Sequence, residues 1–529
     1  MRNFEPQAKT LRETISVNPA TGEILGTVLE HTPENLREAV FKSRKAQEVW
    51  GTTSFGVRAS HMLKIRDYIV EHVEKIAETI SKDTGKTRFD ALSTEVIPSA
   101  MCATYYAREA EHVLGQKKLR RGSVLFWNKR SALQRVPWGV VGIISPWNYP
   151  FSIPFHEYMM ALMAGNGVVA KVSTETQQVA KILDEVMRAG DLPEGLFSLL
   201  NIPGELAGAA FVDSGIDKLF YTGSLPVAKT LVAEAAGRLL PLCLELSGND
   251  AMIVCADAHV DRAVGGVLWA GYSNAGQSCA GVERVYVEEG IYEEFASLLR
   301  KRVKSLRMGP DTNGDVDVGA MTTERQLRIV SDHVTDAIEK GALITAVSEH
   351  VNPHPGGMFY PPTLLENVHD DMLTMQFETF GPVVAVMKVG SIVEAIDRTN
   401  NSNFGLTASV WTRDRAKAHA IASRLKVGTV TINDHLMSHG LAETPWGGFK
   451  QSGIGRTHGA LGLQEMTQTR VVIDDILPGV QKNIWWYPHS RLLHGRMKSV
   501  LEVLYAKHVG RRLIAFPRLL ILFARTFRR

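Results

Sequence analysis

The chain of 529 residues carries 59 Lys and Arg against 56 Asp and Glu, and 45% of its residues are apolar. This is the composition of a globular protein with a large core, and at about 100–200 residues per domain the length predicts two to four domains. The four cysteines are widely spaced, which argues against a disulfide framework and a structural zinc site. Since no Cys/His cluster is present either, we expect no bound metal. Because the N-terminus lacks the apolar stretch of a secretory signal, we expect a cytoplasmic protein.

Positive charge is concentrated at the C-terminus. Residues 491–529 contain ten Lys and Arg and one acidic residue, Glu502, for a net charge of +9. Since the whole chain carries +3, the remainder carries −6. A basic segment therefore follows a mildly acidic body.

Residues 31–115 are predicted to be helical. Thr32 suits the N-cap of a helix whose Leu36, Val40 and Phe41 recur at helical spacing and are expected on one face. A second helical stretch runs from about Phe55 and breaks at SKDTGK.

From Val136 onward, short apolar strands alternate with helices. One strand ends at the turn SPWNYP, a second at Lys171 and a third at YTGS, after which Ser224 opens a helix. A further alternation begins at LCLELSGNDAMIV and continues through VERVYVEEG, VVAVMKV and GTVTIND. Such alternation is typical of parallel, doubly wound sheets, so the predicted fold class is α/β with two units that meet near residues 245–250.

Several residues in these segments suit chemistry, although each also has a plain structural interpretation. Cys279, among the small residues of NAGQSCAGVER, is either a nucleophile or a buried small hydrophobe. Glu245 in LCLELSG is either a general base whose pKa is raised by burial or a carboxylate neutralised at a domain boundary. Asn148, between two prolines, is either an oxyanion donor or a turn former.

A nucleotide site is indicated more weakly. Lys171 at a strand end, and Gly223 and Ser224 at a helix start, occupy places where pyrophosphates bind. Neither a G-x-G-x-x-G fingerprint nor a G-x-x-x-x-G-K-S/T loop is present.

Taken together, these segments resemble the aldehyde dehydrogenase superfamily. The motifs PWNYP, AKVSTET, YTGS, LELSG, GQSC, ETFGPV and PWGGFKQSGIGR occur in the family's order, with Glu245 and Cys279 separated by 34 positions. The similarity runs from about Ser16 to about Ile473.

The resemblance implies an aldehyde dehydrogenase-like α/β fold with a Rossmann-like cofactor domain, a catalytic α/β domain and a β-arm for oligomerisation. The implied cofactor domain is residues 1–120 and 142–245, and the catalytic domain is residues 246–467. The arm is residues 121–141, which look like a hairpin, and 468–490. A basic amphipathic tail, residues 491–529, follows.

The resemblance also implies the reaction and the residues that perform it. The chain is expected to oxidise an aldehyde to the acid through a thiohemiacetal and a thioester on Cys279, with hydride transfer to NAD or NADP. Asn148 and the backbone N–H of Cys279 would hold the oxyanion, and Glu245 would activate the hydrolytic water. The implied cofactor-binding residues are Trp147, Lys171, Ser173, Thr174, Gly223, Ser224, Leu246, Glu378 and Phe380.

Departures from the family pattern leave the choice between NAD and NADP open. Thr174 stands where NAD-preferring relatives often carry a glutamate, and Ala228 and Asn249 replace a common glycine and a common lysine. Two alternatives to a hydrolytic dehydrogenase are a coenzyme A-acylating relative, which Glu245 disfavours, and an inactive scaffold, which the retention of the catalytic residues disfavours.

The C-terminal tail lies beyond the region of similarity. Apolar positions in its middle recur at helical spacing: Met497, Leu501, Leu504, Tyr505 and His508. Its last apolar run, LIAFPRLLILFA, is interrupted by Pro517 and is shorter than the roughly 20 residues that span a bilayer. A basic, apolar-faced segment is typical of a helix on a membrane surface, the alternative being that it packs on the enzyme or on a neighbouring subunit.

Membrane contact would suit a lipophilic, long-chain aldehyde. The other expected partners are further copies of the chain, in a homodimer or homotetramer. Nucleic acid is not expected, because the long apolar run speaks against it.

Overall fold

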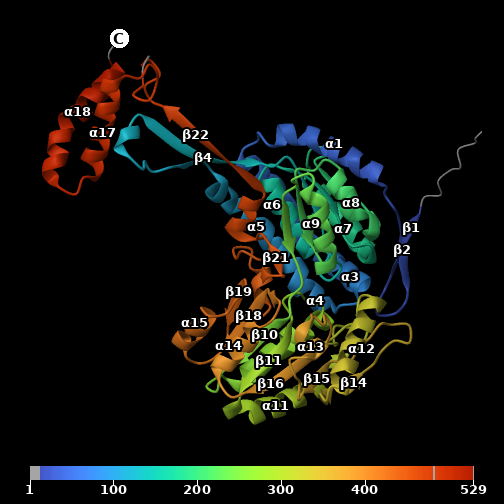
Figure 1. The fold of residues 1–529 in the computed structure, drawn as a ribbon. Coiled ribbons are helices and arrows are strands. Elements are labelled where there is room, and N and C mark those ends of the chain that lie inside the picture. Colours follow the sequence, from blue (N-terminus) through green and yellow to red (C-terminus); the bar gives the residue numbers. More distant parts are fainter. Residues whose placement is uncertain (1–11, 481–482, 528–529) are drawn as a thin grey trace, which may run out of the picture. The chain divides into compact units, whose positions relative to one another are not determined.

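The computed structural model describes residues 12–480 and 483–527. The chain forms two compact units, shown in Figure 1. The larger unit contains the chain up to Gly115 and again residues 135–468, and the smaller one contains residues 116–134 and the chain from Thr469 onward.

The larger unit begins with a β-hairpin and a run of helices, which confirms the helical prediction for residues 31–115. These elements are β1 (Glu13–Val17), β2 (Ile24–Leu29), α1 (Pro33–Trp50), α2 (Phe55–Glu71), α3 (Val73–Thr84), α4 (Arg88–Ala91), the π-helix η1 (Leu92–Val96) and α5 (Ile97–Leu114). Thr32 caps α1 by accepting a hydrogen bond from the backbone N–H of Asn35.

One part of the prediction for α1 is wrong. Leu36 and Val40 are buried, but Phe41 is 59% exposed. At about 100° per residue, Phe41 lies roughly 140° around the helix from Leu36, outside the buried stripe. Its ring is instead covered by the Lys45 ammonium at 4.3 Å.

The first sheet of the larger unit has six strands in the order β21-β9-β8-β5-β6-β7. They are β5 (Val140–Ile144), β6 (Gly167–Lys171), β7 (Phe197–Leu199), β8 (Lys218–Thr222), β9 (Leu242–Glu245) and β21 (Gly453–Ile454). Except for the edge strand β21, all neighbours are parallel. The connecting helices are α6 (Ser152–Met163), η3 (Thr174–Thr176), α7 (Gln177–Arg188), α8 (Gly204–Asp213) and α9 (Leu225–Ala236).

Both faces of this sheet are buried, as expected for parallel strands. On β5, Val141 and Ile143 join the core beneath α2, α5 and α6, whereas Val140 and Ile144 join the core beneath α1, α8 and α9. The period of two along each strand therefore supplies two cores.

The second sheet has seven strands in the order β13-β15-β16-β11-β10-β18-β19. They are β10 (Asp250–Val254), β11 (Val282–Glu288), β13 (Leu343–Val347), β15 (Thr363–Glu366), β16 (Val383–Val389), β18 (Thr407–Trp411) and β19 (Thr429–Ile432). Only β13 is antiparallel to its neighbour. Flanking helices are α10 (Val260–Tyr272), η4 (Ser273–Gly276), α11 (Glu289–Lys304), α12 (Glu324–Glu339), α13 (Leu373–Gln376), α14 (Ile392–Asn400) and α15 (Arg415–Ala422).

The chain returns to the first sheet after the second is complete. After β19 come η5 (Met437–Gly440), β20 (Phe449–Lys450), β21 and α16 (Gly459–Glu465), whereas the short strands β12 (Arg307–Met308), β14 (His350–Val351) and β17 (Phe404–Gly405) lie earlier, between strands of the second sheet. β21 pairs with β9, and α16 packs on α5. These two elements therefore join the first sheet and its helices, although the resemblance assigned residues up to 467 to the catalytic domain. Pairing with β21 satisfies the outer edge of β9, which would otherwise be open.

The smaller unit contains a three-stranded sheet in the order β22-β4-β3, formed by β3 (Lys117–Lys118), β4 (Lys129–Pro137) and β22 (Thr467–Asp475). The predicted hairpin within residues 121–141 is wrong in detail. The partner of β4 on one side is β3, which lies before that segment, and residues 124–126 form the 3₁₀ helix η2 (Val124–Phe126). The ring of Phe126 stacks on Trp485, with centroids 5.6 Å apart.

Two further helices, α17 (Arg491–Tyr505) and α18 (Val509–Phe527), complete the smaller unit. Their shared core is made of Ile484, Leu493, Val500, Leu519 and Leu522, with Leu125 packed against it. The predicted stripe of α17 divides, because Met497 and Leu504 face this core while Leu501, Tyr505 and His508 are exposed.

Pro517 does not interrupt α18. A proline inside a helix removes one hydrogen-bond donor, and here the turns on either side continue the helix. Among residues 12–480 and 483–527, no helix combines the length and the hydrophobicity needed to cross a membrane.

Candidate active site

All the catalytic and cofactor-binding residues predicted from the sequence line one cleft of about 730 Å³. They are Trp147, Asn148, Lys171, Ser173, Thr174, Gly223, Ser224, Glu245, Leu246, Cys279, Glu378 and Phe380. They come from the carboxyl ends of β5, β6, β8 and β9 and from the loops that precede β11 and β16. Both sheets therefore contribute to a single site.

The part of the cleft beside the first sheet follows from its strand order. β5 lies between β6 and β8, so the connections that leave β5 and β8 diverge to opposite sides. Doubly wound sheets bind ligands in the crevice that opens at such a point. Ile144, which ends β5, and Thr222, which ends β8, both line the cleft.

Three features of this part suit a dinucleotide. Lys171 ends β6, its ammonium makes no hydrogen bond or ion pair within the described part of the chain, and burial lowers its pKa to about 8. At Gly223 a Cβ would lie 2.5 Å from the Tyr221 hydroxyl, so only glycine fits. Ser224 is the N-cap of α9, but its side chain caps no backbone N–H, which leaves these groups available to an anion.

Two carboxylates accompany Lys171. Glu175 and Glu205 line the cleft, and their charges raise the pKa of Lys171 against the larger effect of its burial. Negative charge is thus present near Thr174, on Glu175, which follows it in the sequence, and on Glu205.

The loop that carries Cys279 is tightly packed against other backbone. Asn274 and Gly276 have φ angles of 52° and 70°, in the left-handed region. A Cβ at Gly276 would lie 2.0 Å from the carbonyl oxygen of Gly381, and one at Gly248 would lie 2.5 Å from that of Cys279. The small residues therefore allow three backbone segments to meet around the cysteine.

Cys279 and Glu245 lie in the same part of the cleft. Cys279 is half-buried, and its side chain lines both the cleft and the smaller space beside it together with Glu245. Burial, and then the charges of Glu245 and Glu378, raise the pKa of the thiol. Glu245 is 5% exposed and accepts a hydrogen bond of 3.1 Å from the Trp446 indole, yet burial raises its pKa to about 8. Such a carboxylate beside a thiol suits general-base chemistry near neutral pH.

Asn148 reaches the cysteine loop from the turn after β5. Its side-chain Nδ2 donates to the carbonyl oxygen of Gln277 at 3.2 Å. Among the residues that the structure describes, the backbone N–H of Cys279 has no hydrogen-bond acceptor. The Asn148 amide and the Cys279 N–H therefore both belong to, or contact, the cysteine loop.

Comparison with known proteins identifies the kind of enzyme to which this geometry belongs. The model of the aldehyde dehydrogenase family matches residues 6–472. The chain belongs to the aldehyde dehydrogenase family. The similarity read from the motifs is thereby confirmed, and with it the predicted fold class.

Individual relatives cover most of the chain. Identity to the 4,4′-diapolycopene aldehyde oxidase of a Methylomonas species is 35% over 494 residues, 93% of this chain and 91% of the relative. Identity to a protein of Mycolicibacterium smegmatis, provisionally assigned as an NADP-dependent succinate-semialdehyde dehydrogenase, is 36% over 453 residues, 85% of this chain and 87% of the relative. The structure of betaine aldehyde dehydrogenase from Staphylococcus aureus in complex with NAD⁺ superposes with a TM-score of 0.84 at 30% identity and covers 90% of this chain and 94% of that one.

As an aldehyde dehydrogenase, the protein oxidises an aldehyde to the carboxylic acid with NAD or NADP as hydride acceptor. The cleft fits this cofactor. The Lys171 ammonium, the open N-terminus of α9 and the glycine at position 223 together suit a pyrophosphate and a ribose.

Glu378 and Phe380 approach the cleft from the second sheet. The backbone N–H of Gly248 donates to Glu378 at 2.9 Å, and burial raises the pKa of Glu378 to about 7. Phe380 has a φ angle of 52°, and its ring meets that of Trp147 edge-on, with centroids 5.5 Å apart.

Glu283, which the sequence reasoning missed, holds this loop in place. Its carboxylate is 5% exposed and accepts hydrogen bonds from the backbone N–H groups of Thr379 at 2.9 Å and Phe380 at 2.8 Å. Trp446 was missed as well, although it lies in the motif PWGGF. Neither residue carries a sequence signal that distinguishes it from an ordinary strand or loop position.

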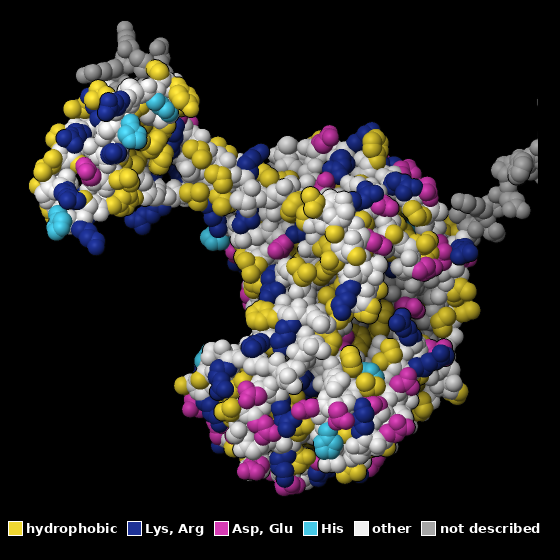
Figure 2. All heavy atoms as spheres, viewed as in Figure 1, with side chains coloured by type: hydrophobic (Ala, Val, Ile, Leu, Met, Phe, Trp, Pro, Cys, Tyr) yellow, Lys and Arg dark blue, Asp and Glu magenta, His cyan; other side chains and the backbone are white. Residues whose placement is uncertain are grey.

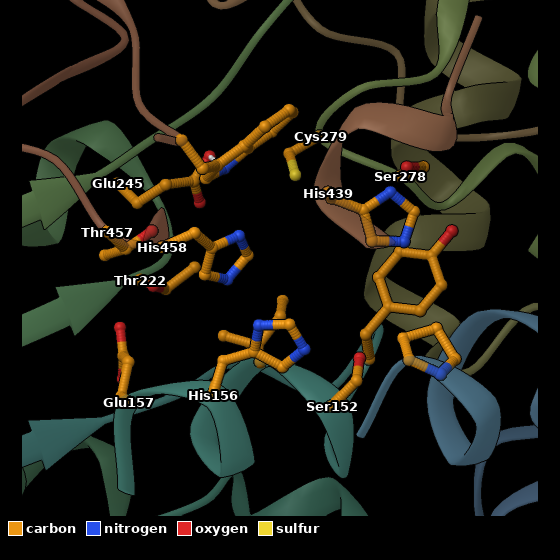
Figure 3. A pocket seen from close by; sticks show the side chains of 14 residues that line it. Ser152, His156, Glu157, Thr222, Glu245, Ser278, Cys279, His439, Thr457 and His458 are labelled. Carbon is orange, nitrogen blue, oxygen red and sulfur yellow. Dashed lines mark hydrogen bonds between the residues drawn. The ribbon is translucent and has the colours of Figure 1, made fainter. Parts of the chain in front are cut away.

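A second, enclosed space adjoins Cys279 and Glu245 (Figure 3). Its volume of about 30 Å³ is enough for one or two water molecules. Three of its lining residues, His156, His439 and His458, are histidines whose pKa values are lowered by burial, so that they are neutral at physiological pH. The lining includes neither Lys nor Arg. No group of three or more metal-ligating side chains occurs among the described residues.

The backbone contact at Gly276 can be tested by adding a methyl group. We expect Gly276→Ala to lower kcat by about 100-fold, because the new Cβ must displace either the cysteine loop or Gly381, and a shift of about 1 Å can have that effect. The measurement is the rate of NAD(P)H formation with an aldehyde. The matched control is Gly265→Ala in α10, where a Cβ meets nothing within 4 Å and activity should be retained. Equal activity of the two variants would contradict the importance of this contact.

Proposed function

We propose that Cys279 is the nucleophile, Asn148 an oxyanion donor and Glu245 the general base of aldehyde oxidation. The observation that carries this assignment is the convergence of the three residues in one cleft, with the Asn148 side chain hydrogen-bonded to the loop that carries Cys279. The other predicted residues in the cleft would bind the cofactor.

In the first half of the reaction, the Cys279 thiol gives its proton to Glu245 and the sulfur attacks the carbonyl carbon. A C–S bond forms and the carbonyl oxygen gains the negative charge. The Asn148 side chain and the backbone N–H of Cys279 donate to this oxygen, and each such donor contributes about 3–4 kcal/mol. Bound NAD or NADP would supply the hydride acceptor, and loss of the hydride from the substrate carbon would leave the acyl group on Cys279 as a thioester.

In the second half, Glu245 has released its proton to solvent and acts as a base again. It takes a proton from a water molecule, whose oxygen attacks the thioester carbonyl. The C–S bond breaks, the acid leaves, and the sulfur is ready for another turnover. The position of Glu245 near the thiol favours this hydrolysis over transfer of the acyl group to coenzyme A.

Cofactor contacts follow from the two ends of the cleft. Lys171, with Ser173 and Thr174 beside it, would hold the adenosine ribose, while Gly223 and Ser224 would hold the pyrophosphate. At the other end, Glu378 would hold the nicotinamide ribose, with Phe380, Trp147 and Leu246 as walls. A 2′-phosphate would meet the cation of Lys171 but also the nearby carboxylates, so both NAD and NADP deserve measurement.

Replacement of the base should impair both halves of the reaction. We expect Glu245→Gln to give at most one equivalent of NAD(P)H per active site and to turn over about 10²–10⁴-fold more slowly than wild type, because both the thiol and the hydrolytic water lack their base. In the wild type, kcat should rise with pH through about 8, as the Glu245 carboxylate forms, and the variant should lose this rise. Rapid-mixing kinetics from pH 6 to about 9.5 with NAD and NADP measures both.

Cys279→Ala is the companion variant and should form no NAD(P)H at all. Full steady-state turnover by either variant would remove the assigned role. If wild type reduces neither cofactor with short, long and aromatic aldehydes, the scaffold alternative gains weight.

The substrate is proposed to be a neutral, lipophilic aldehyde. The enclosed space beside Cys279 offers no cation to a carboxylate-bearing substrate, and burying an unpaired charge costs several kcal/mol. Pro98 and His439 line this space. Near them in the sequence are three apolar residues that are about half exposed: Ile97, Met101 and Met437. A hydrocarbon chain longer than this space can hold would continue along these apolar side chains. The similarity to the 4,4′-diapolycopene aldehyde oxidase supports this class.

Substrates that differ in charge alone test this proposal. Butanal and succinate semialdehyde have the same carbon chain length, and we expect kcat/KM to be at least about 100-fold higher for butanal, since an unpaired buried carboxylate costs roughly 3 kcal/mol or more. Decanal should be the best of the three. Preference for succinate semialdehyde would show that a cation reaches the substrate and would overturn the assignment.

The tail is proposed to lie on an anionic membrane surface. One face of α18 carries a stripe of exposed apolar side chains, each at least 48% exposed: Val509, Leu513, Phe516 and Leu520. Exposed arginines, among them Arg511, Arg512 and Arg518, occur on the same helix. Figure 2 shows apolar and basic side chains side by side on the visible face of α17 and α18. Each basic residue near an anionic leaflet contributes about 1 kcal/mol, in addition to burial of the stripe.

The smaller unit is also proposed to mediate self-association. β22 is the edge of its sheet and exposes Val471, Val472 and Ile473. Such an edge pairs readily with another chain, which supports a homodimer or homotetramer.

Vesicle binding tests the lipid contact. We expect co-sedimentation with vesicles of phosphatidylserine and phosphatidylcholine to fall at least about tenfold when Leu513, Phe516 and Leu520 are replaced by Ser, because apolar area is lost from the contact. The control replaces three exposed apolar residues of the larger unit, Val49, Val70 and Ile338, by Ser and should bind like wild type. Equal binding of both triple variants would contradict the proposal. Light scattering should show the same dimeric or tetrameric mass for all three proteins, since all retain β22.

A further inference from the structure

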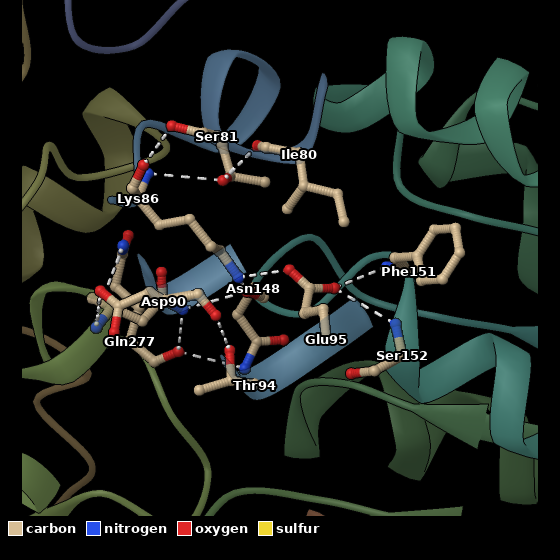
Figure 4. Close-up of polar contacts among 12 residues, drawn as sticks. Ile80, Ser81, Lys86, Asp90, Thr94, Glu95, Asn148, Phe151, Ser152 and Gln277 are labelled. Atoms are coloured by element: carbon tan, nitrogen blue, oxygen red, sulfur yellow. Dashed lines mark hydrogen bonds and ion pairs between the residues drawn. The ribbon is translucent and has the colours of Figure 1, made fainter. Parts of the chain in front are cut away.

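A buried ion pair lies behind the turn that carries Asn148 (Figure 4). Lys86, just before α4, and Glu95, in η1, are 2.6 Å apart, and both side chains are fully buried. Charges at this depth persist only where their remaining hydrogen-bonding capacity is also satisfied. Here it is satisfied by the turn after β5.

Each charge of the pair binds one end of that turn. The Lys86 ammonium donates to the carbonyl oxygen of Asn148 at 2.7 Å. The second oxygen of Glu95 accepts from the backbone N–H groups of Phe151 at 2.8 Å and Ser152 at 3.2 Å. The ion pair therefore fixes residues 148–152 from both ends, using backbone groups that no side-chain substitution in the turn would remove.

Asp90, in α4 of the same helical segment, holds the cysteine loop. Its carboxylate accepts from the Ser273 hydroxyl at 2.7 Å and from the backbone N–H of Asn274 at 3.1 Å. The Asn274 side chain donates in turn to the carbonyl oxygens of Asn148 and Gln277, both at 3.0 Å. A single short segment thus contacts the loop of the oxyanion donor and the loop of the nucleophile.

We propose that Lys86, Asp90 and Glu95 form a positioning clamp that sets the placement of the Asn148 amide relative to Cys279. None of the three is among the residues that line the cleft or the enclosed space, so the clamp acts on the reacting groups only through the two loops. Oxyanion donors must stand about 2.7–3.1 Å from the oxygen that becomes charged, so a small shift of either loop removes their effect. The clamp presupposes the roles proposed above for Asn148 and Cys279.

A double-mutant cycle between Lys86→Met and Asn148→Ala tests the clamp. Lys86→Met removes the donor to the Asn148 carbonyl, and we expect kcat to fall about 10- to 100-fold while KM for the cofactor changes less than about twofold. In wild type, Asn148→Ala should lower kcat about 10²- to 10³-fold. In the Lys86→Met background, Asn148→Ala should lower kcat less than about threefold, because the amide is already misplaced. The readouts are kcat and both KM values with the aldehyde that wild type oxidises best.

Lys86→Met leaves the Glu95 charge unpaired, so the cycle is also run on Lys86→Met/Glu95→Gln, which carries neither charge. The control is Glu366→Gln, which alters a buried carboxylate that binds Arg300, Tyr292 and Thr345 and lines neither space. It should lower the melting temperature without changing kcat.

Three outcomes overturn the clamp. The first outcome is that Asn148→Ala lowers kcat by the same factor in wild type and in Lys86→Met. The second is that the clamp variants have a kcat close to that of Glu366→Gln. The third is an Asn148→Ala variant of wild-type activity, which would show that the oxyanion role itself fails and would remove the basis of the clamp. The first two outcomes, with Asn148→Ala impaired in wild type, reject the clamp alone.

Discussion

The rest of the site depends on the short connection between the two sheets of the larger unit. Residues 246–249 alone carry the chain from β9 to β10. Four residues span at most about 14 Å, so the carboxyl end of the first sheet, with Glu245, must stay close to the amino end of the second. The connection also binds the second sheet directly, because the Gly248 N–H donates to Glu378 and the Asn249 carbonyl accepts from Arg284 at 3.0 and 2.7 Å. Chain geometry thus gathers Glu245, Glu378 and the cysteine loop.

Sequence patterns predicted the alternation of strands and helices, and the motifs predicted which residues line the cleft. These features are local, or are repeated in one order along the chain, and so can be recognised without coordinates. The role of a buried charged residue cannot be recognised in this way. Lys86 and Glu95 look like surface residues of a helix, and Glu283 looks like a polar position on a strand, until the fold brings backbone N–H and carbonyl groups to them. The exposed Phe41 illustrates the opposite error, an apolar residue assigned to a core that does not reach it.

The tail and the β-arm belong together in a way that the order of segments does not reveal. Leu125, before β4, and Ile484, after β22, contribute to the same core as α17 and α18. Removal of the helices would uncover these side chains, so the tail is an integral part of the smaller unit. Its outer apolar stripe is what remains after this packing is complete.

The carboxylates around Cys279 also bear on oxidative damage. Peroxides react with a thiolate and hardly at all with a thiol. Since burial and the charges of Glu245 and Glu378 hold the pKa of Cys279 above its usual value, the sulfur of the resting enzyme stays protonated. In the proposed mechanism, the thiolate forms only when Glu245 accepts the proton of Cys279. The electrostatics that delay attack on the aldehyde thus also protect the sulfur from conversion to sulfinic and sulfonic acids between turnovers.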